Sequence, residues 1–253
     1  MNLTEQQLDK YIKVTISLII VIVLISGGLY YYYYVKPSQG KLSIVDQQVA
    51  ELQKRVRKNP KNVNARIYLA QAYLKNDEIE PAIAELKEVV KLDKENEIAY
   101  YLLGYAYKLQ GKESYGLAKK SFSKVVKLTE GTEFAKINSY LKSSYFFLGE
   151  ITYETEKYKD AAQYYIKSSE IGSKDSDAFR KIGKAYFKLK DYKKAEKYYK
   201  EALRFVPNYA EVYADLGEIY RAQGNKAKAK EQYDKALEYK SDLKEAKEGL
   251  EEL

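Results

Sequence analysis

The chain has 253 residues, with 44 Lys or Arg, 36 Asp or Glu and a net charge of +8. It has no cysteine and no histidine, which excludes disulfides, thiol catalysis and thiolate metal sites, and removes the commonest general base and metal ligand. The other polar side chains form no phosphate-binding P-loop, no GxSxG nucleophile elbow and no glycine-rich dinucleotide turn. We therefore expect no enzyme activity, no metal and no cofactor.

The first part of the chain predicts a membrane anchor. A polar tail, residues 1–13, precedes an uncharged, mainly apolar run at residues 14–35. At 1.5 Å per residue, these 22 residues reach about 33 Å, enough for a hydrocarbon core of roughly 30 Å. We therefore predict a single transmembrane helix. The alternative is a cleaved signal peptide, with an apolar core at residues 14–25 and a cut region at the small residues 26–28.

Five consecutive tyrosines lie near the end of this run. Tyrosine rings favour the interface between bilayer and water, where the hydroxyl group can face water. We therefore assign the following residues to the membrane interface: Tyr30, Tyr31, Tyr32, Tyr33 and Tyr34.

Lysines flank the apolar run on both sides, Lys10 and Lys13 before it and Lys36 and Lys41 after it. The positive-inside rule therefore does not decide the orientation. A short tail with lysines against the membrane suits a signal anchor that carries a large carboxy-terminal domain across the bilayer. We expect a single-pass protein of a bacterial-type cell membrane with that domain outside the cytoplasm. The alternative places it on the cytoplasmic face.

Residues 36–58 predict a juxtamembrane linker followed by a capping helix. Val45, Val49, Leu52 and Val56 recur at spacings of four, three and four, which is the apolar stripe of a helix. This helix could cover the first repeat of the region that follows. The alternative is a short parallel coiled coil that dimerises the anchor, for which two heptads are marginal.

From residue 59 onward the chain repeats a pattern of two helices. A small residue that allows close backbone approach marks the first helix, at Ala70, Gly104, Gly149, Gly183 and Gly217, so the intervals are 34, 45, 34 and 34 residues. An alanine marks the second helix, at Ala82, Ala118, Ala161, Ala195 and Ala229. Large residues on one helix can fill the gaps that these small residues leave on its neighbour.

This pattern of aromatic, Leu-Gly, Tyr, then Ala, aromatic, Ala and Pro resembles the tetratricopeptide repeat (TPR), whose period is about 34 residues. The resemblance covers residues 59–242 as five repeats, with residues 243–253 as a carboxy-terminal capping helix. It implies an all-α fold, a right-handed α-α superhelical solenoid of about five TPR repeats, behind the single transmembrane helix. In such a solenoid each repeat packs only on its neighbours.

The 45-residue interval contains an insertion near residues 129–138. Phe134, Ile137 and Leu141 continue the helical spacing into Tyr145. We therefore expect the first helix of repeat three to be two turns longer than its counterparts. The insertion is either a tolerated change in length or a protrusion that docks a partner.

The resemblance also implies a binding groove, because the first helices of TPR repeats line the concave face. The candidate groove residues are Tyr101, Tyr105, Lys108, Phe146, Glu150, Tyr153, Arg180, Lys184 and Lys188. Their order gives an aromatic middle and a basic distal part, which suits an extended or helical segment with apolar anchors and acidic residues. The alternative is that these tyrosines only pack between helices.

Together these features predict a membrane-anchored scaffold or adaptor that binds a peptide segment or a partner subunit, similar to bacterial anchored TPR proteins that act in complex assembly. The alternatives are a permanent structural subunit of a larger membrane complex and a module that gates another chain's activity. The expected partners are proteins and the lipid bilayer. We expect no nucleic acid, because the lysines of the basic fourth repeat lie on several helical faces and alternate with acids.

Overall fold

The computed structural model describes residues 43–253. The chain divides into two compact units, Met1–Lys58 and Asn59–Leu253. The predicted tail, transmembrane helix and interfacial tyrosines lie outside the described residues. Within residues 43–253, no helix has both the length and the apolar character needed to cross a bilayer.

The described part of the first unit holds one helix, α3 (Ile44–Lys58). Ser43 and Asp46 form a reciprocal capping box, in which each side chain accepts a hydrogen bond of 3.0 Å from the other residue's backbone N–H. Three residues of the predicted stripe, Val49, Leu52 and Val56, are buried. The helix is therefore confirmed, while its capping role and the coiled-coil alternative stay predictions.

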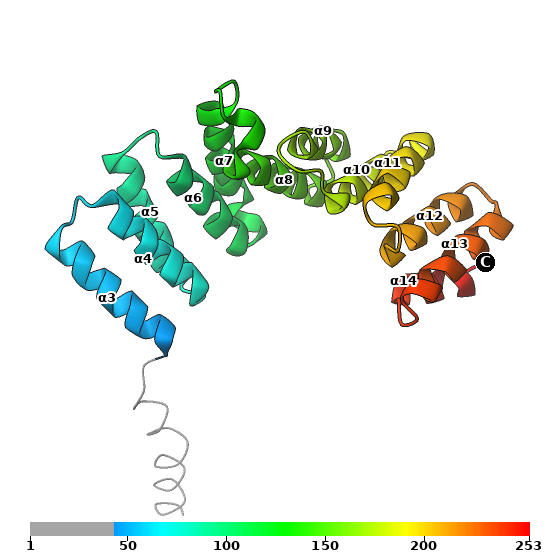
Figure 1. Cartoon of the computed structure of the whole chain (residues 1–253), viewed down its shortest axis with the longest axis horizontal. Coiled ribbons are helices and arrows are strands. Elements are labelled where there is room, and N and C mark those ends of the chain that lie inside the picture. Colours follow the sequence, from blue (N-terminus) through cyan, green and yellow to red (C-terminus); the bar gives the residue numbers. More distant parts are fainter. Residues whose placement is uncertain (1–42) are drawn as a thin grey trace, which may run out of the picture. The chain divides into compact units, whose positions relative to one another are not determined.

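The second unit consists of five helix pairs and one further helix (Figure 1). In chain order they are α4 (Val63–Lys75) with α5 (Ile79–Leu92), α6 (Glu97–Leu109) with α7 (Tyr115–Thr129), α8 (Ser139–Glu154) with α9 (Tyr158–Ser169), α10 (Ser176–Lys188) with α11 (Tyr192–Phe205), α12 (Ala210–Ala222) with α13 (Lys226–Tyr239), and α14 (Lys244–Glu251). Residues 43–253 hold twelve α-helices and no strand. The predicted all-α fold of paired helices is confirmed over this range.

A glycine in four first helices lies against an aromatic ring of the second helix of the same repeat. The pairs are Gly104 with Phe122, Gly149 with Tyr165, Gly183 with Tyr199, and Gly217 with Tyr233. A Cβ atom built on Gly183 would lie 2.4 Å from Cε1 of Tyr199, which is closer than van der Waals contact allows. All four rings are fully buried. The small residue of the repeat therefore lets the second helix fill the core with an aromatic side chain.

Each turn between paired helices contains one residue in the left-handed region of the backbone. These residues are Asp77, Gly111, Glu156, Lys190 and Gly224, with φ between 57° and 102°. They follow the same 34, 45, 34 and 34 intervals as the glycine positions. The five turns therefore share a positive φ at this position, although only two of them use glycine, which adopts it without strain. Gly111 has ψ −171° and leads into the 3-10 turn Lys112–Ser114, so its turn differs from the other four.

The insertion does not extend α8 by two turns, so that expectation is wrong. α8 has 16 residues, against 13 in α6 and α10. Asn138 is its N-cap, with an extended backbone and a side-chain oxygen that accepts a 2.8 Å hydrogen bond from the N–H of Leu141. Before it, Ala135–Ile137 form a single 3-10 turn, η3. The apolar residues keep a helical spacing through the insertion, but α8 begins only after the N-cap Asn138.

The insertion is held against the loop that follows α9. The Gly172 N–H donates a 2.8 Å hydrogen bond to the carbonyl of Lys136. Phe134 and Ile137 are 63% and 74% exposed, so neither belongs to the apolar stripe of α8. The insertion is thus a surface loop that carries two exposed apolar side chains.

Candidate functional site

The first helices α6, α8, α10 and α12, followed by α14, form one side of the second unit, which we call the first-helix face. Its middle is aromatic. Tyr101 and Tyr105 of α6 lie with their ring centroids 6.3 Å and 5.8 Å from that of Phe147 on α8. The Tyr140 ring lies 5.1 Å from Tyr101. A tyrosine phenol is protonated at neutral pH and can donate a hydrogen bond, and burial raises the pKa of Tyr101 further.

Phe147, which the sequence did not single out, contacts the α6 tyrosines, and the predicted Phe146 next to it makes different contacts. The Phe146 ring packs 5.6 Å from Tyr165, inside the repeat, and Tyr153 packs edge-on against Tyr158 at 5.2 Å. Two adjacent phenylalanines point about 100° apart on a helix, so Phe147 faces α6 while Phe146 lies nearer α10, with Lys181 Nζ 5.8 Å from its ring centroid. The part of Phe146 in binding stays a prediction. Both residues were visible in the sequence, and only the packing distinguishes them.

Glu150 connects three consecutive first helices. Its carboxylate lies 3.1 Å from Lys108 Nζ of α6 and 2.8 Å from Lys181 Nζ of α10. Burial alone would raise the pKa of Glu150, but the hydrogen bonds and charges of Lys181 and Lys108 lower it overall. The Lys108 ammonium also lies 5.5 Å from the Phe147 ring centroid. The predicted Lys108 and Glu150 are thus brought together, and Lys181 joins them.

Asp215 of α12 makes the same kind of connection one repeat further on. Arg180 Nε donates a 2.6 Å hydrogen bond to its carboxylate, and Lys184 Nζ lies 3.7 Å from its other oxygen. Burial raises the pKa of Asp215. Two of the three residues in the predicted basic part therefore share an acidic partner, while Lys188 is exposed. Asp215, 35 residues after Arg180 in the sequence, therefore offsets part of the positive charge expected here.

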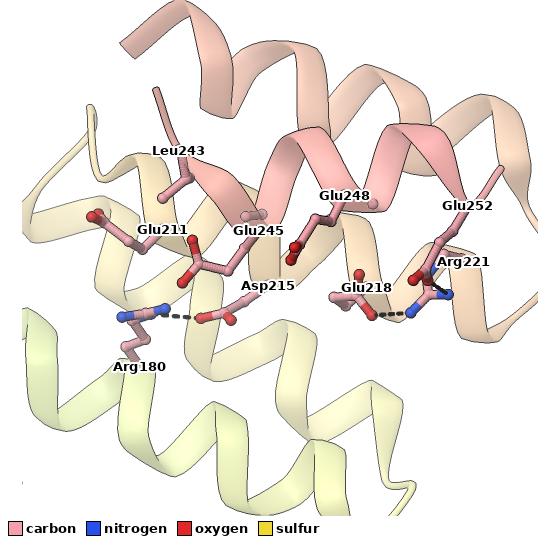
Figure 2. A pocket seen from close by; sticks show the side chains of 11 residues that line it. Arg180, Glu211, Asp215, Glu218, Arg221, Leu243, Glu245, Glu248 and Glu252 are labelled. Carbon is pink, nitrogen blue, oxygen red and sulfur yellow. Dashed lines mark hydrogen bonds and ion pairs between the residues drawn. The ribbon is translucent and has the colours of Figure 1, made fainter. Parts of the chain in front are cut away.

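A pocket of about 250 Å³ opens between α12 and α14 (Figure 2). Its apolar part is formed by Ala214, Leu243 and Gly249. Six carboxyl groups and two guanidinium groups line the rest: Glu211, Asp215, Glu218, Glu245, Glu248 and Glu252, with Arg180 and Arg221. The lining therefore carries an excess of four negative charges.

Some of these carboxylates are already paired. Arg221 lies between Glu218, at 2.6 Å, and Glu252, at 2.5 Å. At the rim, Lys240 lies 2.9 Å from Glu211. Glu245 makes no ion pair within the described part of the chain, and in Figure 2 it points from α14 towards α12. The pocket is therefore a polar cavity with remaining negative charge, which favours a cationic group.

The pocket residues come from helices that are far apart in the sequence, so periodicity did not predict the pocket. The nearest signal was the acidic run at the end of the chain, EGLEEL, which we assigned to a solvated cap. No group of three or more acidic side chains within residues 43–253 has the arrangement of a metal site.

Two family models match this chain, and both are described as tetratricopeptide repeat. They match residues 45–127 and 175–242. The unmatched segment between them contains the insertion and most of repeat three. No curated protein sequence matches the chain.

Solved structures share the fold. YrrB, described as "a TPR protein with an unusual peptide-binding site", is 25% identical, with 80% of this chain and 98% of YrrB covered and a TM-score of 0.66. MamA from Desulfovibrio magneticus RS-1 is 20% identical, with 72% and 97% covered and a TM-score of 0.62. The carboxy-terminal part of a TPR repeat-containing protein from Cytophaga hutchinsonii is 19% identical, with 78% and 74% covered and a TM-score of 0.66. The last two show a common fold only.

Proposed function

Because this chain is a tetratricopeptide repeat protein, we propose that it binds a segment of a partner protein along the first-helix face. The observation that carries this proposal is the continuity of that face. The rings of Tyr101, Tyr105 and Phe147 lead into the Glu150 ion pairs. Further along the same face lie the ion pairs of Asp215 and then the pocket between α12 and α14. The peptide-binding site named for YrrB, which has the same fold, supports the proposal.

The ion pairs between first helices prepare this face for binding. Glu150 and Asp215 each hold cations from neighbouring repeats, so the side chains are ordered before a partner arrives. Binding then costs less side-chain entropy than it would on a face of free lysines. Aromatic rings next to this ordered polar surface are the usual anchors of a protein interface.

The charge of the pocket defines the partner more closely. We propose that a lysine or arginine side chain of the bound segment enters between α12 and α14, while an apolar side chain of the same segment lies on the α6 and α8 rings. Glu245, Glu248 and Glu252 are the carboxylates on the α14 side of the pocket. Glu248 forms an exposed pair with Lys244 at 3.2 Å and Glu252 is paired with Arg221, so Glu245 is the first carboxylate that the cation meets. This proposal differs from the acidic segment expected from sequence, because Arg180 and Lys184 are paired with Asp215.

Recovery of the partner with tagged full-length chain tests this function. We expect Tyr101→Ala with Tyr105→Ala to reduce recovery at least about 30-fold, since two interface aromatics contribute roughly 2 kcal/mol or more. Glu245→Gln with Glu248→Gln should reduce it about 10-fold and lessen its salt dependence. The matched controls are Tyr164→Ala with Tyr239→Ala and Glu88→Gln with Asp160→Asn, which lie on second helices. Full recovery by the Tyr101 and Tyr105 variant, with an unchanged melting temperature, would refute the use of this face.

We further propose that the array is held at a membrane, on the strength of the apolar run at residues 14–35 alone. A single cysteine at Ser241 tests the orientation, because the chain has no other cysteine and Ser241 is exposed. Labelling by a membrane-impermeant maleimide in intact cells would place the array outside the cytoplasm, as we expect. Protection until the cells are broken would place it inside.

The alternative is a permanent subunit of a membrane complex, held by the same apolar segment. Purification in a gentle detergent distinguishes the adaptor from the permanent subunit. An adaptor is released largely as free protein and rebinds its partner reversibly, whereas a permanent subunit stays with its complex.

A further inference from the structure

A row of four cations lies along the outer side of α11. Its members are spaced by four, three and four residues, which places them on one side of the helix: Lys193, Lys197, Lys200 and Arg204. All four are exposed, on the side opposite the buried Ala195, Tyr199 and Ala202. We call them the basic row.

Three of the four equivalent positions of α13, 34 residues later, carry the opposite charge, and the fourth is an alanine. They are Ala227, Glu231, Asp234 and Glu238, all of them exposed. They also lie opposite the buried core residues of their helix, Ala229, Tyr233 and Ala236. We call these four residues the acidic row. Both rows span 11 residues, or about 16 Å of helix.

No other second helix of the array carries four cations or three acids at these positions, although Lys120, Lys124 and Lys127 place three cations on the outer side of α7. The same positions hold Glu80, Ala84, Lys87 and Lys91 in α5, Gly116, Lys120, Ser123 and Lys127 in α7, and Lys159, Gln163, Ile166 and Glu170 in α9. The two rows are therefore not a requirement of the fold. They also lie on second helices, so binding along the first-helix face does not explain them.

The rows belong to two helices that each contact α12. Tyr220 of α12 donates a 2.9 Å hydrogen bond to Glu196 of α11, and Lys228 of α13 lies 5.4 Å from the Tyr220 ring centroid. Some row members have partners within their own helix, such as Lys200 with Glu196 at 2.7 Å and Glu231 with Lys235 at 2.8 Å. These pairs are exposed and contribute little, so the charges stay available to a partner.

We propose that the two rows form a self-association surface, on which two copies of this chain pair about a two-fold axis. The axis lies between α11 and α13 and runs parallel to them. Equivalent helices of consecutive repeats run in the same direction, so the axis brings the basic row of each copy onto the acidic row of the other. Each contact then occurs twice, as in any isologous interface. The facing positions are Lys193 with Ala227, Lys197 with Glu231, Lys200 with Asp234, and Arg204 with Glu238.

A second copy fits this surface better than an anionic lipid layer or a nucleic acid. A polyanion would be attracted by the basic row and repelled by the acidic row beside it. The acidic row of a second copy matches the basic row in sign, in spacing and in length. Because the contact relies on exposed charges, the association is weak and depends on salt: the Debye length falls from about 10 Å at 0.1 M to about 3 Å at 1 M ionic strength.

Sedimentation of the full-length chain in a mild detergent, at low and high salt, tests the proposal. The first variant reverses the basic row, with Lys197→Glu, Lys200→Glu and Arg204→Glu. The second reverses the acidic row, with Glu231→Lys, Asp234→Lys and Glu238→Lys. Each should weaken the dimer at least about tenfold, because each puts like charges face to face. A mixture of the two variants should associate again, since each then meets the charge opposite to its own.

The matched control is Lys112→Glu with Lys120→Glu and Lys127→Glu, which makes the same change in net charge on α7 and the turn before it. It should leave the dimer unchanged. A wild-type chain that is monomeric at low salt would overturn the proposal. So would a mixture of the two reversed variants that fails to associate, or a dimer that neither reversal weakens.

Disulfide formation in the native membrane gives a second test, because the chain has no cysteine of its own. Two differently tagged chains would carry Lys193→Cys and Ala227→Cys. Oxidation should link the two variants to each other more efficiently than either to itself. Equal linking within and between the variants would exclude the proposed two-fold pairing.

Discussion

At the scale of single residues, the packing of repeats two to five depends on a missing methyl group. The Tyr199 ring occupies the space that a Cβ on Gly183 would need, at 2.4 Å to 3.0 Å from three of its ring atoms. Repeat one has Ala70 at this position and the smaller Leu86 as the second-helix residue, and both are fully buried. The size of the second-helix side chain therefore determines whether the first helix can carry a methyl group there.

We expect Gly183→Ala to lower the free energy of unfolding by up to about 2 kcal/mol. Alanine gains about 1 kcal/mol in helix propensity over glycine, but forcing a methyl group against a buried ring costs about 1–3 kcal/mol and shifts the backbone as well. The overpacking term wins because Tyr199 is only 1% exposed and has no room to retreat. Urea denaturation measures the change.

Gly116 provides the control for this substitution. It lies in the first turn of α7, and a Cβ built on it meets no atom within 4 Å. Gly116→Ala should therefore stabilise the protein by about 0.5–1 kcal/mol through helix propensity alone. Equal effects of the two substitutions would show that the ring does not decide the outcome at Gly183.

At the scale of elements, the boundary of α8 shows how a cap can override a helical pattern. Asn138 donates through Nδ2 to Glu97 at 3.1 Å, in addition to capping α8 through its oxygen. The side chain thus connects the start of α8 to the start of α6. An interaction with a preceding repeat cannot be read from the spacing of Phe134, Ile137 and Leu141.

We expect Phe134→Ser with Ile137→Ser to change the free energy of unfolding by less than about 0.5 kcal/mol, because exposed side chains contribute little to folding. Leu141→Ala, which removes a side chain only 2% exposed, should cost about 2–5 kcal/mol. Thermal or urea unfolding of the three proteins makes the comparison. A large loss from the Phe134 and Ile137 variant would mean that the insertion packs as an extension of α8.

At the scale of the whole array, stability is a sum of repeats and of interfaces between neighbours. α14 contributes Leu243 and Ala246 to the apolar cluster of repeat five, which includes Ala210, Ala229 and Tyr233. A Cβ on Gly249 would lie 2.4 Å from the Tyr233 ring, so α14 approaches repeat five as closely as a first helix approaches its own second helix. α14 is thus part of the apolar core of repeat five, and not only a capping helix on its surface.

We expect removal of residues 243–253 to cost about 2–4 kcal/mol locally, since it exposes the side chains that Leu243 and Ala246 cover. Amide hydrogen exchange should become faster in α12 and α13 and stay unchanged in α4 to α7, because each repeat depends mainly on its neighbours. Faster exchange throughout the array would indicate that the repeats unfold together.

The sequence by itself determined the repeats, because their spacing follows from local helix geometry. A helix places every third or fourth residue on one side, so the intervals between Gly104, Gly149, Gly183 and Gly217 predicted the helix pairs. Local signals also predicted that Tyr101, Tyr105, Lys108 and Glu150 lie on first helices, and these residues do make contacts between neighbouring first helices. Their part in binding stays a prediction.

The tertiary structure alone decided the charge and the shape of the candidate site. Arg180 and Lys184 form a basic patch in the sequence, but Asp215 lies against them in space. The pocket between α12 and α14 likewise combines residues about 30 positions apart. Ion pairs and cavities depend on which side chains meet across a helix interface. Which side chains meet depends on how far apart two helices lie and how each is rotated about its axis. The residue spacing within a single helix gives no information on either quantity.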